Sequence, residues 1–124
     1  MRILLADDQP KVRSALRVLL GQQPDVQIVG EAGSAEQLLA QIKVTRPDLL
    51  LFDWNLPGLS SNGRFSGLRS LYPEVKMIAL SGRPDMRQAA LTSGADAFVS
   101  KVDPPDRLLA AVLTIRNEIN EEML

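Results

Sequence analysis

The stretch LLLFDWNLPG at residues 49–58 decides the fold of this chain. Its first four residues are all apolar, which is typical of a strand that is buried on both faces of a parallel sheet. An ionisable carboxylate, Asp53, follows directly, and Pro57 and Gly58 then favour a turn. A buried strand that ends in a charge raises the question of what compensates that charge at the end of the strand.

Short apolar runs alternate along the chain with segments of helical periodicity. The apolar runs predict five strands, at residues 2–6, 26–30, 48–52, 75–80 and 97–100. The periodic segments predict helices at 11–20, 35–46, 84–94 and from 104 onward, with a short or frayed helix within 59–71. Strands that alternate with helices require crossover connections, so we expect an α/β fold in three layers: a doubly wound, five-stranded parallel sheet with helices on both faces.

Three helix ends carry local sequence signals. Ser34 is expected to cap the second helix, with Gln37 three residues later completing a capping box. Gly21 is expected to end the first helix in a left-handed conformation. Asp103 is expected to cap the last helix, with Pro104 at its first position.

Composition excludes several classes of function. The chain has 124 residues, enough for one domain with a substantial core. It contains no cysteine and no histidine, which rules out disulfides, thiolate zinc sites and catalysis by Ser-His or Cys-His pairs. The net charge is −1 with mixed signs along the chain, unlike a nucleic-acid-binding surface. No apolar run reaches the ~20 residues of a membrane span and no signal peptide is visible, so we expect a soluble cytoplasmic protein.

Polar side chains follow four of the five predicted strands, at the point where each strand ends. Asp7 and Asp8 follow the first strand, Asp53 the third, Ser81 the fourth and Lys101 the fifth. In open parallel sheets the carboxyl ends of the strands form one edge, where ligands bind. Taken singly, Asp8 is typical of a helix cap, Ser81 of a turn and Lys101 of a solvated loop. Their occurrence together at matching strand ends favours a shared site.

Three carboxylates that meet one lysine leave excess negative charge at this edge. Two unit charges ~4 Å apart repel by about 4 kcal/mol at an effective dielectric of roughly 20, so either one acid takes up a proton or a cation binds. Oxygen ligands without histidine or cysteine select a hard ion, and a site with few carboxylates suits Mg²⁺. Lysine and serine donors beside that ion suit a phosphoryl group. One carboxylate is then free to act as a nucleophile, as in aspartyl-phosphate chemistry.

Four motifs carry a resemblance to a known family: ADD (6–8), LLLFDWNLPG (49–58), ALSG (79–82) and GADAFVSK (94–101). Together they resemble the receiver domain of two-component response regulators, and the resemblance covers essentially all of residues 1–124 as one phosphoacceptor domain. It implies a flavodoxin-like fold with strand order 2-1-3-4-5. It also implies a signalling switch that is not an enzyme on foreign substrates and assists only its own phosphorylation and dephosphorylation.

The resemblance assigns roles to the residues at the strand ends. Asp53 matches the phospho-accepting aspartate, and Lys101 matches the lysine that pairs with the phosphoryl oxygens. Ser81 would hydrogen-bond the phosphoryl group. Phe98 matches the aromatic switch residue whose rotamer follows that serine.

Mg²⁺ is the cofactor that the resemblance implies. Asp8 would bind the ion directly and Asp7 mainly through water, while Asp53 and the backbone carbonyl of Asn55 would complete the protein ligands. The family often has a cis proline directly after the lysine, whereas this chain has Val102. A cis bond before a residue other than proline costs about 2.5–4 kcal/mol, so we expect a trans bond here.

The resemblance also implies partners. A histidine kinase would donate the phosphoryl group, since this chain has no histidine of its own. Phosphorylation would then bias two states of the face formed by the last two helices and the last strand. The output would be transcriptional, through a C-terminal DNA-binding domain or a homodimer partner. This domain itself is expected to bind neither nucleic acid nor membrane.

Two other functions stay open on the sequence alone. A Mg²⁺-dependent phosphatase or phosphotransferase with an aspartyl intermediate would carry a second acid two residues after its nucleophile, where this chain has Asn55. A pseudo-receiver, which binds its partner independently of phosphorylation, would be expected to have lost an acid or the lysine. None of these residues is missing.

Overall fold

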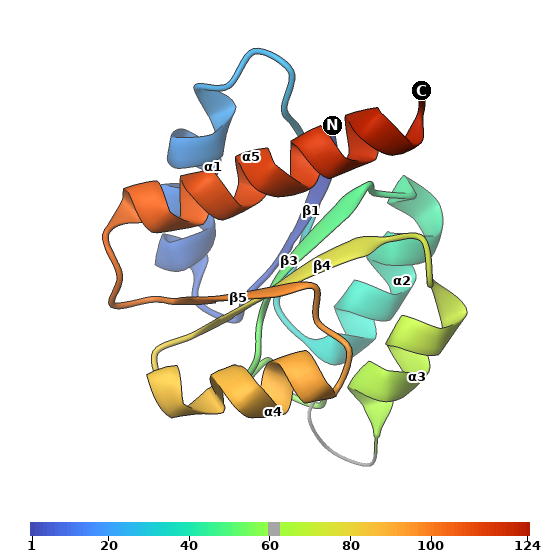
Figure 1. Ribbon diagram of the computed structural model, residues 1–124. Coiled ribbons are helices and arrows are strands. Elements are labelled where there is room, and N and C mark those ends of the chain that lie inside the picture. The colour runs from blue at the N-terminus through green and yellow to red at the C-terminus, as the bar shows by residue number, and fades with distance from the viewer. Residues whose placement is uncertain (60–62) are drawn as a thin grey trace.

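Parallel strands in the order β2-β1-β3-β4-β5 form the central sheet of the computed structural model, which describes residues 1–59 and 63–124 (Figure 1). The elements in chain order are β1 (Arg2–Ala6), α1 (Pro10–Gly21), β2 (Gln27–Ala32), α2 (Ala35–Thr45), β3 (Leu49–Asp53), α3 (Arg64–Leu71), β4 (Lys76–Ser81), a 3₁₀ turn η1 (Pro84–Met86), α4 (Arg87–Thr92), β5 (Ala97–Ser100) and α5 (Pro105–Glu122). The expected α/β class, the five-stranded parallel sheet and the strand order 2-1-3-4-5 are confirmed.

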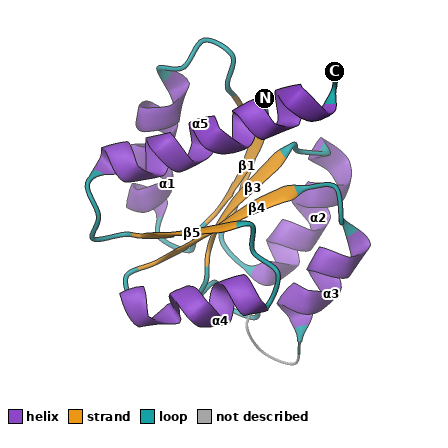
Figure 2. Ribbon diagram, in the orientation of Figure 1, coloured by secondary structure: helices purple, strands orange, loops and turns teal. Residues whose placement is uncertain are grey.

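Side chains of the central strands alternate between two apolar cores. Leu50 and Phe52 of β3 pack with α2, α3 and α4, whereas Leu49 and Leu51 pack with α1 and α5. Figure 2 shows these two sets of helices on opposite faces of the sheet. Each fully buried leucine or phenylalanine stabilises the fold by about 1.5–3 kcal/mol. This burial on both faces is why the strand has no alternating polar positions.

The second helix begins as its sequence predicts. Ser34 Oγ accepts the backbone N–H of Gln37 at 3.2 Å, which confirms the N-cap. The Gln37 side chain differs from the expected capping box, because it accepts the N–H of Gly33 at 2.7 Å and not that of Ser34. The reciprocal hydrogen bond therefore closes one residue before the cap.

Two other helix-end predictions are corrected in part or in full. α1 ends at Gly21 as predicted, but Gly21 has no positive φ, and Gln22 after it is also right-handed. Asp103 does not cap α5, which begins at Pro105 with Pro104 in the cap position. The backbone N–H of Asp103 instead donates to the carbonyl of Ser100 at 3.1 Å and closes the turn after β5.

The expectation of a short third helix is confirmed, since α3 has eight residues. Residues 60–62 of the preceding polar stretch lie outside the described residues. The bond before Val102 is trans, as expected, because no cis peptide occurs among the residues that the structure describes. Within the same ranges, no helix has both the length and the apolar character needed to cross a bilayer.

The last helix returns along the sheet. α5 begins next to the carboxyl end of β5 and ends beside the start of β4, where Lys76 Nζ lies 3.2 Å from Glu122 Oε1. Both chain ends therefore lie at the amino edge of the sheet, as Figure 1 also shows.

Arg69 of α3 clamps this amino edge. Its Nη2 donates to the carbonyl oxygens of Tyr72 and Val75 at 2.9 and 2.6 Å, and its Nη1 lies 3.1 Å from Asp96 Oδ2. Asp96 also accepts the N–H of Met77 at 2.8 Å. One guanidinium thus joins the turn before β4 to the turn before β5.

Gly94 lies against this clamp, and we expect Gly94→Ala to lower the free energy of unfolding by about 1–3 kcal/mol. Its φ is +118°, and an added Cβ would meet Arg69 Cγ at 2.9 Å. Urea denaturation followed by circular dichroism measures the change. Gly67→Ala is the control, since an added Cβ there has nothing within 4 Å and the helical site should gain roughly 0.5–1 kcal/mol. Equal effects of both substitutions would contradict the argument.

Candidate functional site

The carboxyl ends of the strands meet at one edge because the strands pair in register. Ala6 of β1 pairs with Phe52 of β3, and Ser81 of β4 pairs with Ser100 of β5. The chain leaves each of these strands at the same level. The residues that follow, among them Asp7 and Lys101, are therefore brought together as the sequence predicts.

Three carboxylates converge at this edge. One carboxylate oxygen from each of Asp7, Asp8 and Asp53 lies within 4.8 Å of the other two. Asp7 and Asp53 are only 1% and 6% exposed, whereas Asp8 is exposed. Burial strengthens the repulsion between such charges, so two of the three acids need a positive partner inside the protein.

Lys101 is that partner. Its Nζ lies 2.6 Å from Asp7 Oδ2 and 3.2 Å from Asp53 Oδ2. Burial acts to lower the pKa of this lysine, but the hydrogen bond that it donates to Asp7 and the charge of Asp53 outweigh it, so that the pKa lies above its usual value of 10.5. Lys101 is therefore firmly cationic, and it is held in place by its backbone N–H, which donates to the carbonyl of Ser81 at 2.8 Å.

The two buried acids are held in the same way. Asp7 Oδ1 accepts the backbone N–H of Gln9 at 2.9 Å, and Asp53 Oδ1 accepts that of Asn55 at 2.9 Å. Each is an Asx-type turn, in which the carboxylate bonds the backbone two residues on. The second oxygen of each acid faces Lys101. Asp8 differs, because its carboxylate forms no hydrogen bond or ion pair with any of the described residues.

Ser81 is fully buried beside this group. Its Oγ accepts the backbone N–H of Arg83 at 3.0 Å and lies 3.4 Å from Nδ2 of Asn55. The Asn55 amide thus links the turn after β3 to the end of β4. This places the hydroxyl at the same edge as Asp53.

The donor set fits a hard divalent cation. The three carboxylates and the single ammonium leave an uncompensated charge of two negative units, and the clustered ligands are all oxygen. Such a set suits Mg²⁺, and Asp8 is the acid whose oxygens are least engaged by the protein. The metal ligation by Asp7, Asp8, Asp53 and the Asn55 carbonyl stays a prediction.

Phe98 lies on the edge strand β5, which β4 separates from Asp53 at the end of β3. Its side chain is 6% exposed and belongs to the core beneath α2, α3 and α4. The backbone carbonyl of Phe98 accepts a hydrogen bond from Arg87 of α4 at 3.3 Å. The ring is therefore at the sheet's edge on the α4 side, away from the core that α5 covers.

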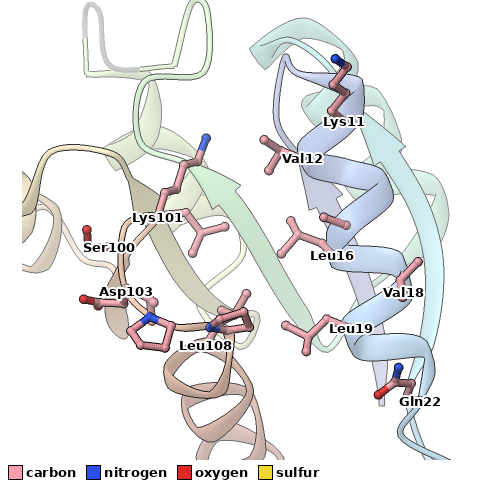
Figure 3. Close-up of a pocket in the computed structure, with 15 residues that line it drawn as sticks. Lys11, Val12, Leu16, Val18, Leu19, Gln22, Ser100, Lys101, Asp103 and Leu108 are labelled. Carbon is pink, nitrogen blue, oxygen red and sulfur yellow. The ribbon is translucent and has the colours of Figure 1, made fainter.

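An apolar cleft of about 680 Å³ adjoins the site between α1 and the start of α5 (Figure 3). Its apolar lining includes Val12, Ala15, Leu16, Leu19, Leu80, Val99 and Leu108. Lys11 and Lys101 lie at one end, with their ammonium groups at the same end of the view in Figure 3. Lys101 therefore belongs both to the acidic site and to the wall of this cleft.

Sequence reasoning missed Arg13 of α1. Its Nη1 donates to the backbone carbonyl of Asp7, and its Nε lies 3.0 Å from Glu31 Oε1. No local pattern could have revealed this, because the ion-pair partner, Glu31, lies eighteen residues away on β2.

We expect Lys101→Met to lower the free energy of unfolding by about 2 kcal/mol in EDTA, since it leaves two buried carboxylates without a cation. Saturating Mg²⁺ should shrink this loss. Lys76→Met is the matched control, because Lys76 is about as exposed but pairs with the exposed Glu122. Its loss should stay under about 1 kcal/mol and be independent of Mg²⁺. Urea denaturation with and without Mg²⁺ measures both, and equal, metal-independent losses would count against the site.

Comparison with known proteins places this geometry in a family. The chain matches the response regulator receiver domain over residues 3–113. It is 35% identical over 112 residues to the nitrate/nitrite response regulator protein NarL of Escherichia coli (strain K12), a match that covers 89% of this chain and 52% of NarL. It is 36% identical over 114 residues to the transcriptional activator protein ExaE of Pseudomonas putida, covering 90% of this chain and 53% of ExaE. The chain thus spans about half the length of these relatives.

A solved structure has the same architecture. The crystal structure of a LuxR-family two-component response regulator from Aurantimonas sp. SI85-9A1 is 27% identical, with a TM-score of 0.83 over 98% of this chain and 96% of that one. The isolated REC domain of RcsB from Salmonella enterica serovar Typhimurium, at 23% identity and a TM-score of 0.84 over 94% of this chain and 88% of that one, is alike in fold. On the family match and the relatives together, this chain belongs to the response regulator receiver domain family.

Proposed function

We propose that this domain is a phosphorylation-dependent signalling switch in which Asp53 accepts a phosphoryl group from a histidine kinase. The observation that supports it most directly is the position of Asp53. It is a nearly buried carboxylate, clustered with two other acids and 3.2 Å from the ammonium of Lys101. An anionic nucleophile next to a fixed cation is the arrangement that phosphoryl transfer requires.

The contacts of Asp53 with the Asn55 N–H and with Lys101 support the following step of phosphoryl transfer. A carboxylate oxygen attacks the phosphorus of a phosphohistidine, the P–N bond breaks, and the leaving imidazole keeps the bonding pair and takes a proton from solvent. The Asn55 N–H, 2.9 Å from Oδ1, orients the carboxylate. Lys101 is already within contact distance and would follow the new phosphoryl oxygens.

We propose that Asp7, Asp8, Asp53 and the Asn55 carbonyl hold Mg²⁺ for this reaction. When bound, the ion would supply positive charge that screens the carboxylates and the transferred oxygens. The Asx turns of Asp7 and Asp53 fix those two acids in advance, which limits the reorganisation needed.

The switch would run through Ser81 and Phe98. The Ser81 hydroxyl would turn toward the phosphoryl group and exchange its present hydrogen bond from the Arg83 N–H. Phe98 lies under α4, a helix of six residues in which only Ala90 is buried. An element with so few buried side chains has a low cost of displacement, which favours it as the part that moves.

The output of the whole protein is proposed from its relatives. ExaE is a transcriptional activator, and RcsB has been solved bound to promoter DNA. We propose that this receiver controls a C-terminal DNA-binding domain or a homodimeric state. We also propose that it acts in the cytoplasm, where a histidine kinase phosphorylates it.

Two alternatives are tested by turnover. A phosphatase would hydrolyse para-nitrophenyl phosphate continuously in Mg²⁺, although Asn55 stands where such enzymes carry a general acid. A pseudo-receiver would take up no phosphoryl group at all. The proposed switch lies between these outcomes, with one phosphoryl group per chain and no turnover of the ester.

We expect acetyl phosphate with Mg²⁺ to add one phosphoryl mass to the wild type and none to Asp53→Ala, measured by intact-protein mass spectrometry. The fluorescence of Trp54, directly after Asp53 and the only tryptophan, should change in the same samples. Asp85→Asn is the matched control, because Asp85 is an exposed acid whose one ion pair within residues 1–59 and 63–124 is with Arg83, at 3.2 Å. A mass gain that survives in Asp53→Ala would refute the assignment.

We expect Ser81→Ala to accept the phosphoryl group but to lose the response of α4. Hydrogen exchange of the α4 amides, before and after acetyl phosphate, measures that response. Ser100→Ala is the matched control, because Ser100 is the neighbour of Ser81 in the sheet and is also buried. An unchanged α4 response in Ser81→Ala would remove the serine from the switch.

A further inference from the structure

Arg13 of α1 connects Glu31 on β2 to the backbone at the acidic edge. Its side chain is 20% exposed, and its Nε lies 3.0 Å from Glu31 Oε1 on β2. Its Nη1 donates to the backbone carbonyl oxygen of Asp7. The arginine therefore spans from an ion pair on one strand to the turn that carries two of the clustered acids.

The carbonyl of Asp7 has a specific place in the site. It belongs to the same planar peptide unit as the N–H of Asp8, so fixing the carbonyl fixes the plane from which Asp8 departs. The Asp7 N–H is already held by the carbonyl of Ala32 at 2.9 Å. The Asp8 carboxylate has no hydrogen-bond partner of its own within the described part of the chain. Its direction therefore depends on the backbone, and Arg13 is the side chain that holds that backbone.

Glu31 holds the Arg13 side chain in place and offsets part of its positive charge. Arg17, on the next turn of α1, also binds Glu31, with its Nε 2.6 Å from Oε2. Burial acts to raise the pKa of Glu31, but the hydrogen bonds and charges of Arg17 and Arg13 outweigh it and lower the pKa below 4.5. Glu31 is thus ionised near neutral pH and offsets part of the positive charge beside the acids.

We propose that Arg13 is a positioning residue for the cation site: by holding the Asp7–Asp8 peptide unit, it directs the Asp8 carboxylate toward Asp53. This inference rests on the proposed Mg²⁺ site. The proposed effect of Arg13 on Mg²⁺ affinity is opposite to the effect that its charge alone would have. A nearby arginine repels a cation, so its charge alone would weaken Mg²⁺ binding, whereas its hydrogen bond to the Asp7 carbonyl strengthens it.

The test is a titration of the full chain with Mg²⁺, in which the fluorescence of Trp54 reports binding. Arg13→Ala should weaken Mg²⁺ binding about tenfold, the lower end of the range for residues that hold metal ligands. Arg17→Ala is the matched control, because Arg17 binds the same carboxylate but, among the described residues, forms no hydrogen bond with Asp7. Its Mg²⁺ affinity should stay within about twofold of the wild type. Arg13→Lys keeps the charge without the planar fork and should recover only part of the loss.

A double-mutant cycle separates positioning from a general loss of structure. If Arg13 acts through Asp8, the Arg13→Ala and Asp8→Asn double variant should bind Mg²⁺ within about twofold of Asp8→Asn alone. The inference would be overturned if the two substitutions lowered Mg²⁺ affinity independently, so that the fold-loss in the double variant equalled the product of the two single losses. It would also be overturned by an Arg13→Ala variant that binds Mg²⁺ as well as the wild type or better. If Arg13→Ala does not fold in EDTA, Arg13→Lys and Glu31→Gln take its place in the same cycle.

Failure of the proposed site itself is distinguishable. A wild type whose Trp54 signal and isothermal titration both show no Mg²⁺ binding would refute the metal site and this inference with it. A wild type that binds Mg²⁺, with Arg13→Ala and Arg17→Ala indistinguishable from each other, would refute only the role of Arg13.

Discussion

One ammonium group holds the acidic edge of this domain together. Lys101 contacts both Asp7 and Asp53, the two carboxylates that the fold removes from water. Burying a carboxylate costs several kcal/mol of solvation free energy, which a nearby cation offsets. The lysine is itself held in position by the hydrogen bond from its backbone N–H to the carbonyl of Ser81 at the end of β4. The site is thus a consequence of strand register, because the pairing of β1, β3, β4 and β5 sets the distance between these charges.

The two edges of the sheet are built on opposite principles. At the amino edge, Arg69 meets several backbone carbonyls and Asp96, so that its positive charge is matched. At the carboxyl edge, three acids share one lysine and the balance stays negative. The amino edge is thus electrostatically paired, while the carboxyl edge keeps a negative imbalance that a bound cation can reduce. Functional sites commonly carry such an imbalance.

The sequence predicts the sheet and the convergence of the acids well, for a physical reason. A continuously apolar strand such as 49–52 is typical of a parallel sheet that is covered on both faces, and the carboxyl ends of parallel strands meet at a common edge. The ends of helices are less predictable, since they fray and their limits vary by one or two residues, as at Gly21 and Asp103. Arg13 is not predictable at all, because its contacts join residues from β1 and β2 that only the folded sheet brings together.

The return of α5 has a consequence for where other molecules can be attached. Its final turn lies beside the start of β4, and Figure 1 shows both chain ends there, across the sheet from the acids. A reporter protein grafted onto Leu124 would leave the aspartate pocket open to a donor. A module appended there lies at the opposite edge of the sheet from Asp53, and α5 is the element that joins the two edges, from Pro105 to Glu122.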